Sequence, residues 1–168
     1  MGNREIFEFR ADMNEKTLWY FSMYHANKGY LGIFNVLFTL AALYLLVTTW
    51  ADSDAPYRIM LVICALLFTV YQPLKLRLKA KKQASLAVMK EPIFMVFTRD
   101  GFTVRQGEQD QEIAWNQVGR VEGTKGMVMI YMDRIHAFLL PNEAMGEKRG
   151  EFCAMLKEVL PKERRKRI

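Results

Sequence analysis

Cysteine and histidine are scarce in this sequence, which leaves little material for a metal site or a disulfide. The only two cysteines among 168 residues are Cys64 and Cys153. They do not form the spaced pairs that bind zinc, and we expect no disulfide between them, which suits a reducing compartment. Neither His25 nor His136 has a second ligand residue at metal-binding spacing. We therefore predict a structural role for the histidines, and neither a metal nor a cofactor.

The motifs that most enzymes need are also missing. The chain contains no GxSxG elbow, no HExxH helix and no GxxxxGK[ST] phosphate loop. Glu108, Asp110 and Glu112 are close together, but alternation would turn them to solvent, and no second acid-rich segment completes a metal site with them. Without a convergent acid, base and nucleophile, we predict that the protein is not an enzyme. A membrane-bound enzyme is kept as an alternative.

What the chain does contain is a pair of long apolar runs near its front. The first, Leu31 to Trp50, carries no charged residue. At about 1.5 Å of helical rise per residue it matches the roughly 30 Å hydrocarbon core of a bilayer. The second runs from Ile59 to Leu74, and the rest of the chain has too little apolar mass to bury both. We predict a transmembrane helical hairpin at residues 31–78, with its second span at about residues 58–76.

Basic residues follow the second run directly and orient the hairpin. Lysine and arginine near the ends of membrane helices stay on the cytoplasmic side. This places both termini in the cytoplasm and predicts a multi-pass protein of the cell membrane. The same residues lie where anionic lipid headgroups are, each contributing up to about 1 kcal/mol. With those of the basic C-terminal tail, the candidate contacts for anionic lipid are Lys75, Arg77, Lys79, Lys81, Lys82, Arg164, Arg165, Lys166 and Arg167.

Nucleic acid is the rival partner for a chain with a net charge of +6. Nucleic-acid binding requires a basic face interleaved with aromatic residues, and the sequence does not indicate one. We therefore predict no nucleic acid, and no small-molecule substrate, among the partners.

Residues 1–30 are predicted to form a cytoplasmic strand and an amphipathic helix. The strand, Asn3 to Arg10, is too short to stand alone, so we expect it to add to the edge of a sheet formed later in the chain. Asp12, three residues before Glu15, resembles a capping box for a helix from about Asn14 to Lys28. The aromatic residues of this helix suit the lipid headgroup region, and a partner-binding face is the alternative.

A basic connector at residues 79–91 leads to a run of strand signals. Asp100-Gly101 lies between two short apolar runs and predicts a hairpin, because both residues tolerate positive φ. Antiparallel strands continue to Leu140. Trp115 falls within them, where a tryptophan is more often a core or seam residue than a ligand platform.

A helix is predicted after these strands. Apolar residues recur on one helical face at Phe152, Met155, Leu156, Val159 and Leu160. Such a helix covers a sheet, and Pro161 ends it. The C-terminal domain is thus predicted at residues 92–161, followed by a solvated basic tail at residues 162–168.

In several segments the chain resembles the bacterial YcxB-like family. The resemblance is carried by Tyr24-His25, the hairpin, Asp100-Gly101, the IAWNQVGRVEGT segment around Trp115 and the FLLPNEAM segment that leads into the last helix. It implies an N-terminal segment, two membrane helices and a C-terminal pleckstrin-homology-like (PH-like) domain. The predicted fold class is therefore an α+β membrane protein: a two-helix transmembrane hairpin, then a small antiparallel PH-like β-barrel or sheet capped by a C-terminal helix.

From these observations we predict a non-catalytic, membrane-anchored scaffold, sensor or regulatory protein of the bacterial plasma membrane. It would present its cytoplasmic PH-like domain to a partner protein or to anionic lipid. The alternative is an accessory subunit of a membrane transport or export system, in which the hairpin packs against a larger partner or a second copy. The residues expected at that contact are Gly32, Asn35, Thr39, Ala41 and Ala42.

Overall fold

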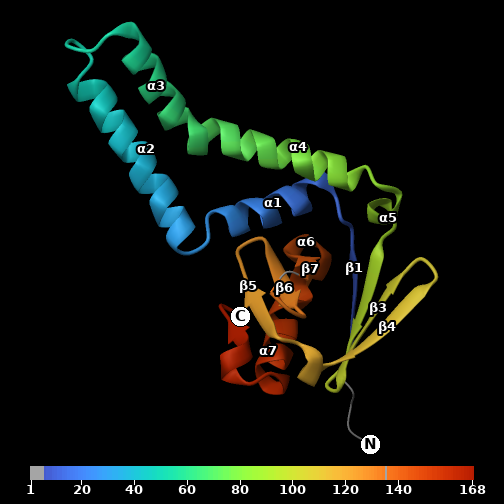
Figure 1. Ribbon diagram of the computed structural model, residues 1–168. Coiled ribbons are helices and arrows are strands. Elements are labelled where there is room, and N and C mark those ends of the chain that lie inside the picture. The colour runs from blue at the N-terminus through green and yellow to red at the C-terminus, as the bar shows by residue number, and fades with distance from the viewer. Residues whose placement is uncertain (1–5, 135) are drawn as a thin grey trace, which may run out of the picture. The chain divides into compact units, whose positions relative to one another are not determined.

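The structure is a computed structural model that describes residues 6–134 and 136–168. The chain divides into two compact units (Figure 1). We call Asn14–Leu86 the helical unit, and Met1–Met13 together with Ala87–Ile168 the sheet unit. The N-terminal strand therefore belongs with the C-terminal part of the chain, not with the helix that follows it.

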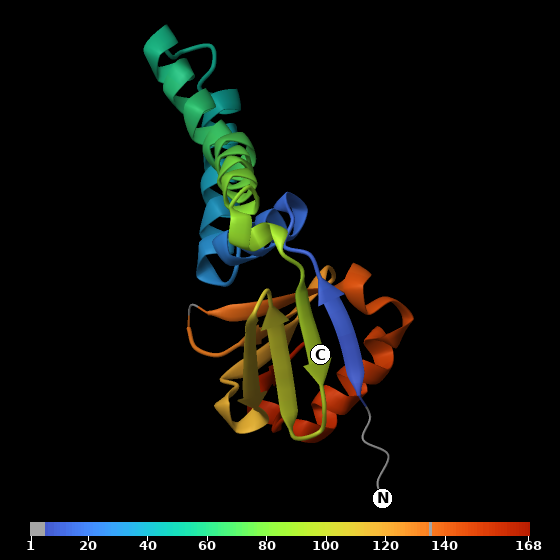
Figure 2. The same ribbon diagram turned by 90° about the vertical axis from the view of Figure 1, so that its right-hand side faces the viewer.

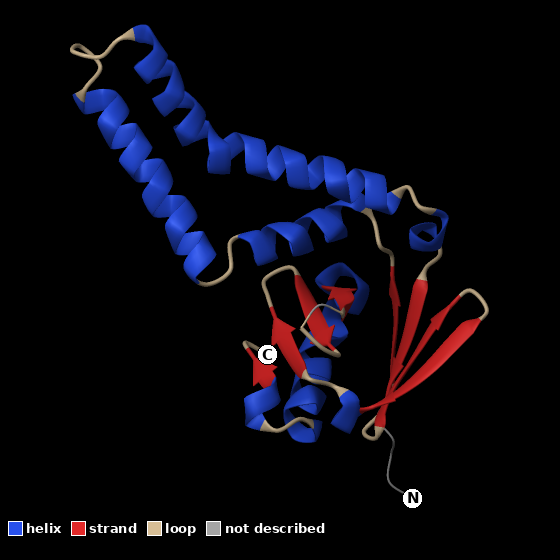
Figure 3. Cartoon of the chain, in the orientation of Figure 1, coloured by secondary structure: helices blue, strands red, loops and turns tan. Residues whose placement is uncertain are grey.

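The helical unit consists of helices joined by short loops (Figure 3). Its elements are α1 (Glu15–Ala26), α2 (Tyr30–Thr48), α3 (Ala55–Leu66), the π-helical turn η1 (Leu67–Tyr71) and α4 (Gln72–Ala84). The predicted capping box of α1 is wrong: the side chain of Asn14 accepts the Thr17 amide hydrogen bond at 2.9 Å. Asp12 instead pairs with Arg10, at 3.4 Å. Asn14 is the residue directly before the first turn, where its short side chain reaches the unpaired amides.

Two helices are long and apolar enough to cross a membrane, in agreement with the two predicted runs. They are Tyr30–Thr48, of 19 residues, and the continuous helix Ala55–Ala84, of 30 residues. The second helix extends well beyond the expected end near residue 76, into the basic residues and the start of the predicted connector. Leucine, lysine, arginine, glutamine and alanine are all good helix formers, so nothing in the basic segment stops the helix.

A proline explains the irregular turn within the second helix. Pro73 has no amide hydrogen, and its ring crowds the carbonyl group four residues earlier. Directly before it, the Gln72 amide donates to the Leu67 carbonyl, five residues back, in the wider π-helical turn η1. The helix axis changes direction at this turn, between α3 and α4 (Figure 1).

Two polar residues of α2, Asn35 and Thr39, are buried in the helical unit. The Asn35 amide group donates to the Asn27 side-chain oxygen at 3.2 Å and to that of Gln72 at 3.4 Å. Thr39 is also buried, and its hydroxyl donates to the Asn35 carbonyl. Ala42 is 5% exposed. These residues were expected to contact a partner subunit, but they face neighbouring helices of their own chain.

A glycine at the start of α2 permits a close approach of the backbone. A Cβ added at Gly32 would lie 2.1 Å from the carbonyl oxygen of Asn27. Gly32 therefore serves the turn between α1 and α2. Of the residues expected at a contact with a partner, only Ala41 is exposed.

The sheet unit contains two four-stranded sheets (Figure 2). Their strands are β1 (Phe7–Ala11), β2 (Ile93–Phe97), β3 (Gly101–Gln106), β4 (Gln109–Ala114), β5 (Arg120–Gly123), β6 (Met127–Tyr131), β7 (Ala137–Pro141) and β8 (Arg165–Lys166). The strand orders are β1-β2-β3-β4 and β7-β6-β5-β8. As expected, β1 adds antiparallel to β2 at a sheet edge. The antiparallel prediction is confirmed, but within the described residues the strands form no closed barrel.

Helical segments complete the sheet unit. They are α5 (Ala87–Lys90), η2 (Trp115–Gln117), α6 (Asn142–Met145), η3 (Gly146–Lys148), α7 (Arg149–Val159) and η4 (Lys162–Arg164). The buried Phe152 of α7 packs its ring against those of Phe9 and Phe97, with centroids 5.1 and 4.7 Å away. The predicted C-terminal helix thus covers the sheet that contains β1 and β2.

The hairpin predicted at Asp100-Gly101 joins β2 to β3, although for a different reason from the expected one. Among the described residues, positive φ is found elsewhere, and not at Asp100 or Gly101. A Cβ added at Gly101 would lie 2.3 Å from the carbonyl oxygen of Ile113, so glycine is needed there for close packing of β3 against β4. The predicted core role of Trp115 is confirmed: it is 6% exposed, and its indole N–H donates to the Thr98 carbonyl at 3.0 Å.

Candidate functional site

The nine predicted lipid contacts are divided between the two units. Residues 75–82 contribute those of α4, in the helical unit, and residues 164–167 contribute those of the tail, in the sheet unit. Each set is described separately below.

The five basic residues of α4 are all exposed, and they fall in two rows along the helix. Lys75, Lys79 and Lys82 are spaced four and three residues apart, so they share one side. Arg77 and Lys81 are four residues apart and form the second row. At 100° per residue the two rows do not coincide, so the basic cluster flanks a strip of helix surface on both sides.

Leucines occupy the strip between the two basic rows. Leu74 and Leu78 are four residues apart and are 54% and 60% exposed. A helix that carries apolar residues flanked by lysines suits the boundary between headgroups and acyl chains, because the leucines enter the apolar layer while the lysine stems extend to the headgroups. We call Leu74, Leu78 and the basic residues on either side of them the lysine-flanked face of α4.

The opposite side of α4 packs against α1. Ala80 is fully buried there. The Trp19 indole donates to the Pro73 carbonyl at 3.1 Å. Arg77, at the edge of the lysine-flanked face, also reaches α1 and forms an ion pair with Glu15 at 2.9 Å. Helix α1 therefore packs against one side of α4 and pairs with Arg77, while Leu74, Leu78 and the four lysines of the lysine-flanked face stay exposed.

The basic tail is not the solvated segment that the sequence predicts. Arg165 and Lys166 form β8, which pairs parallel with β5. The Arg164 guanidinium donates to the carbonyls of Asn116 and Val118, at 3.0 and 3.2 Å. These carbonyl partners come from segments far away in the sequence, which local patterns do not reveal.

The predicted lipid contacts of the tail consequently differ among themselves. Arg164 and Arg165 are half-buried, and Arg165 donates to the Lys157 carbonyl. The structure therefore gives these two arginines the role of fastening the tail to the sheet unit. Lys166 and Arg167 are exposed, so only they retain side chains open to an external anion.

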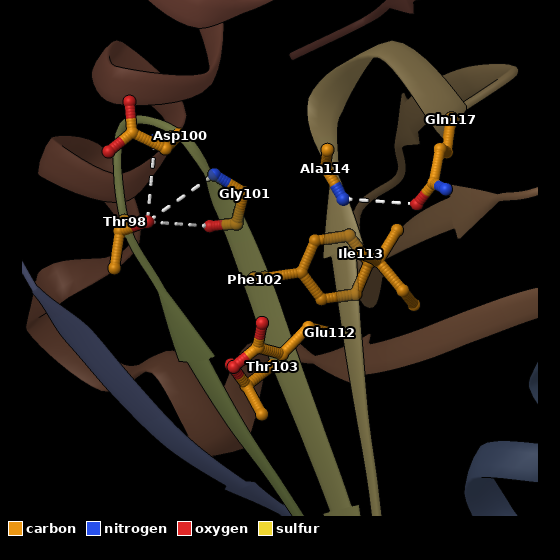
Figure 4. Close-up of a pocket in the computed structure, with 9 residues that line it drawn as sticks. All are labelled: Thr98, Asp100, Gly101, Phe102, Thr103, Glu112, Ile113, Ala114 and Gln117. Carbon is orange, nitrogen blue, oxygen red and sulfur yellow. Dashed lines mark hydrogen bonds between the residues drawn. The ribbon is translucent and has the colours of Figure 1, made fainter.

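A hollow that the sequence did not indicate lies at the open end of the β3–β4 hairpin, where β3 begins and β4 ends (Figure 4). It has a volume of about 520 Å³, and its polar lining includes Thr98, Asp100, Thr103, Glu112 and Gln117. The Thr98 hydroxyl accepts hydrogen bonds from the amides of Asp100 and Gly101, each at 3.3 Å, and these bonds fix the β2–β3 turn. The hollow thus combines a rigid turn with two carboxylates.

Residues 97–155 match the family model described as YcxB-like protein. This match confirms the resemblance that the sequence shows to that family. The matched segment, which we call the YcxB-like segment, runs from the last residue of β2 into α7. It contains the hollow and Trp115, whereas α4 lies outside it. No curated protein and no solved structure matches the chain.

Several ionisable groups of the YcxB-like segment have perturbed pKa values. Two hydrogen bonds from Arg105, at 2.8 and 3.1 Å, lower the pKa of the Asp110 carboxyl. Burial raises the pKa of the Tyr131 hydroxyl and that of the Cys153 thiol. Asp110 therefore stays ionised to a lower pH than an ordinary aspartate, while Cys153 and Tyr131 stay protonated to a higher pH than usual.

The histidines make local contacts. Nδ1 of His25 lies 3.2 Å from the Phe21 carbonyl, one turn earlier in α1. Nδ1 of His136 lies 2.6 Å from Oδ2 of Asp133, a partner that the sequence analysis missed because it depends on the shape of the β6–β7 turn. Across residues 6–134 and 136–168, no three histidine, cysteine, aspartate or glutamate side chains are grouped to hold a metal ion.

Proposed function

We propose that the protein is a non-catalytic scaffold, sensor or regulatory protein anchored in the bacterial cytoplasmic membrane. The hairpin of α2 and the α3–α4 helix crosses the bilayer, and the lysine-flanked face of α4 contacts anionic headgroups at the cytoplasmic side. The sheet unit is presented in the cytoplasm. The observation that carries this proposal is the exposure of the two apolar helices. The second of them ends in the lysine-flanked face, which suits the boundary of a membrane.

The exposure of these helices favours a membrane over the interior of a soluble protein. Only 17% of the apolar window in Tyr30–Thr48 is buried, and 11% of that in Ala55–Ala84. A core helix of a soluble protein would be mostly buried. Large apolar side chains such as Leu37 and Val47, 61% and 77% exposed, need an apolar environment that hydrocarbon supplies.

Charge asymmetry supports the proposed orientation. The link between α2 and α3 contains Asp52 and Asp54, and the single basic residue near it, Arg58, lies at the start of α3. Arg58 lies over the Trp50 ring, 4.9 Å from its centroid, and donates to the Ser53 carbonyl at 2.8 Å. The other end of the hairpin carries the basic rows of α4. Positive charge is retained in the cytoplasm, so this end and both termini are placed there.

The PH-like character of the sheet unit is also part of the proposal. The succession of antiparallel strands β1 to β7 followed by α7 supports it, as does the family resemblance. The two sheets remain separate, so the similarity concerns the order of elements and the helix that covers a sheet.

Lipid retention tests the role of the lysine-flanked face. Phosphatidylglycerol or phosphatidylcholine would be added to the full chain in mild detergent, and native mass spectrometry would count the lipids that stay bound. We expect phosphatidylglycerol to be retained preferentially. Replacing Lys75, Lys79 and Lys82 by glutamine should lower its affinity at least ten-fold, since each lysine contributes about 1 kcal/mol near an anionic surface.

A matched control removes the same charge elsewhere. Lys148, Lys157 and Lys162 are exposed lysines of the sheet unit, and their replacement by glutamine should leave phosphatidylglycerol binding almost unchanged. Equal losses in the two triple variants would show that net charge alone drives retention, and would contradict a site on α4.

A further inference from the structure

The outer edge of β4 is an open strand edge with acidic side chains. We propose that this edge binds an extended, lysine- or arginine-rich segment of a partner protein by strand addition. The inference deepens the proposed function, on which it rests for the non-catalytic binding role of the sheet unit, by naming the chemistry of the partner.

The backbone of β4 has unused hydrogen-bonding capacity on one side. Within residues 6–134 and 136–168 this strand pairs with β3 alone and ends its sheet, and all its residues except Ile113 are exposed. The Ala114 amide points away from β3, because it donates to the side-chain oxygen of Gln117 at 3.1 Å. Backbone groups alternate in direction along an antiparallel strand, so those of Asp110 and Glu112 point to the same open edge. An added strand would pair with these two residues.

Charge determines which strand fits. Glu112 is exposed and makes no ion pair with the described residues, whereas Asp110 is neutralised by Arg105 at 2.8 Å. Glu108 adds a carboxylate in the β3–β4 turn. Pairing of two β4 edges from two copies would bring like charges together, which disfavours self-association here. A strand with lysine or arginine facing Glu112 gains a favourable cross-strand pair.

The hollow at the end of β4 offers a place for one long basic side chain. Its volume of about 520 Å³ falls within the range of about 300–1,000 Å³ typical of ligand pockets. Asp100 and Glu112 are its two carboxylates, and Figure 4 shows Glu112 next to Thr103 of the neighbouring strand. A basic residue of an added strand, placed beside Glu112, would reach this hollow.

The chain itself provides an example of the proposed contact. Its basic tail adds to the edge of β5 as the strand β8, through Arg165 and Lys166. A basic extended segment is therefore compatible with a sheet edge of this unit. Because the tail is already paired with β5, it does not fill the edge of β4.

Peptide binding tests the inference. The full chain would be placed in nanodiscs of phosphatidylcholine alone, so that no anionic lipid attracts the probe. The probe is a fluorescent ten-residue peptide of alternating arginine and threonine, compared with one of alternating glutamate and threonine, and anisotropy measures the affinities. We expect binding of the arginine peptide only. Equal affinity for both peptides, or binding of neither, would overturn the inference.

Two substitutions separate charge from strand pairing. Glu112→Thr removes the carboxylate and keeps the amide, and should weaken binding about three-fold, as for an exposed ion pair. Glu112→Pro also removes the outward amide at a position where an edge strand tolerates proline, and should weaken binding at least ten-fold. Glu8→Thr, on the exposed side of β1 in the same sheet, is the matched control and should bind normally.

Hydrogen exchange gives a readout that charge alone would not change. Strand addition should slow exchange at the amides of Asp110 and Glu112 when the arginine peptide binds. Unchanged exchange, or equal binding by the proline and threonine variants, would overturn strand addition. Loss of peptide binding with intact phosphatidylglycerol retention would refute this inference and leave the proposed membrane role standing.

Discussion

Asn35 shows how a single polar residue is accommodated in an apolar hairpin. Its amide group lies within hydrogen-bond distance of the Ala26 carbonyl and of the side chains of Asn27 and Gln72. An unpaired amide in hydrocarbon costs several kcal/mol. The partners come from two segments, the end of α1 and the start of α4, so the sequence could indicate that Asn35 needs partners but not which ones.

The Cys153 thiol should react slowly. Burial raises its pKa, so less thiolate is present at a given pH than in an ordinary thiol. In a Cys64→Ala background, alkylation by iodoacetamide at pH 8, followed by mass spectrometry, should be slower than that of glutathione. The rate should continue to rise with pH beyond the point where glutathione levels off. A rate equal to that of glutathione at pH 8 would show that the thiol is not shielded.

Other features of single residues were predictable only in part. Trp115 was assigned to the core because a large aromatic residue among apolar neighbours is usually buried, and it is. Its place in the turn η2 instead of a strand was not predicted, because this turn depends on the Gln117 side chain. The carbonyl partners of Arg164 depend on the tertiary fold.

Helix α7 is the element on which the sheet unit depends most directly. Leu156 is fully buried in it, and Leu156→Ala should lower the free energy of unfolding by roughly 2 to 5 kcal/mol, the usual range for such a cavity. Thermal unfolding of the full chain, followed by near-ultraviolet circular dichroism, measures the change. The neighbouring exposed Lys157→Ala should change stability by less than about 0.5 kcal/mol. Similar melting of both variants and the unmodified chain would mean that α7 is not needed to cover the sheet.

Elements with strong local patterns were predictable, and those that depend on distant partners were not. The apolar runs predicted α2 and α3, and the helical spacing of apolar residues that begins at Phe152 predicted α7, because periodic apolar residues define a buried or lipid-facing side. The extension of α4 to Ala84 was not predicted, because the helix was expected to end where the basic residues begin. Those residues mark only the end of the apolar run. Strand β8 has two residues and no apolar pattern, and it exists only because β5 offers an edge.

For the whole molecule, the sequence predicts which strands and helices each part contains better than whether the strands close into a barrel. Antiparallel strands followed by a helix were expected, and both are present. The strands form two sheets because the chain leaves the first sheet after β4, through the turn η2, and begins β5 in the second. Whether such sheets close into a barrel depends on hydrogen bonds between strands that are distant in sequence, which periodicity cannot reveal.

The proposed membrane topology is most directly tested by the accessibility of single cysteines in living membranes. In a chain with Cys64 and Cys153 replaced by alanine, Asp52→Cys would mark the link between α2 and α3, and Ser85→Cys would mark the end of α4. Bacterial spheroplasts would be treated with a membrane-impermeant maleimide. We predict that position 52 is labelled in intact spheroplasts and position 85 only after permeabilisation. Labelling of both positions from outside, or of position 85 alone, would contradict the account.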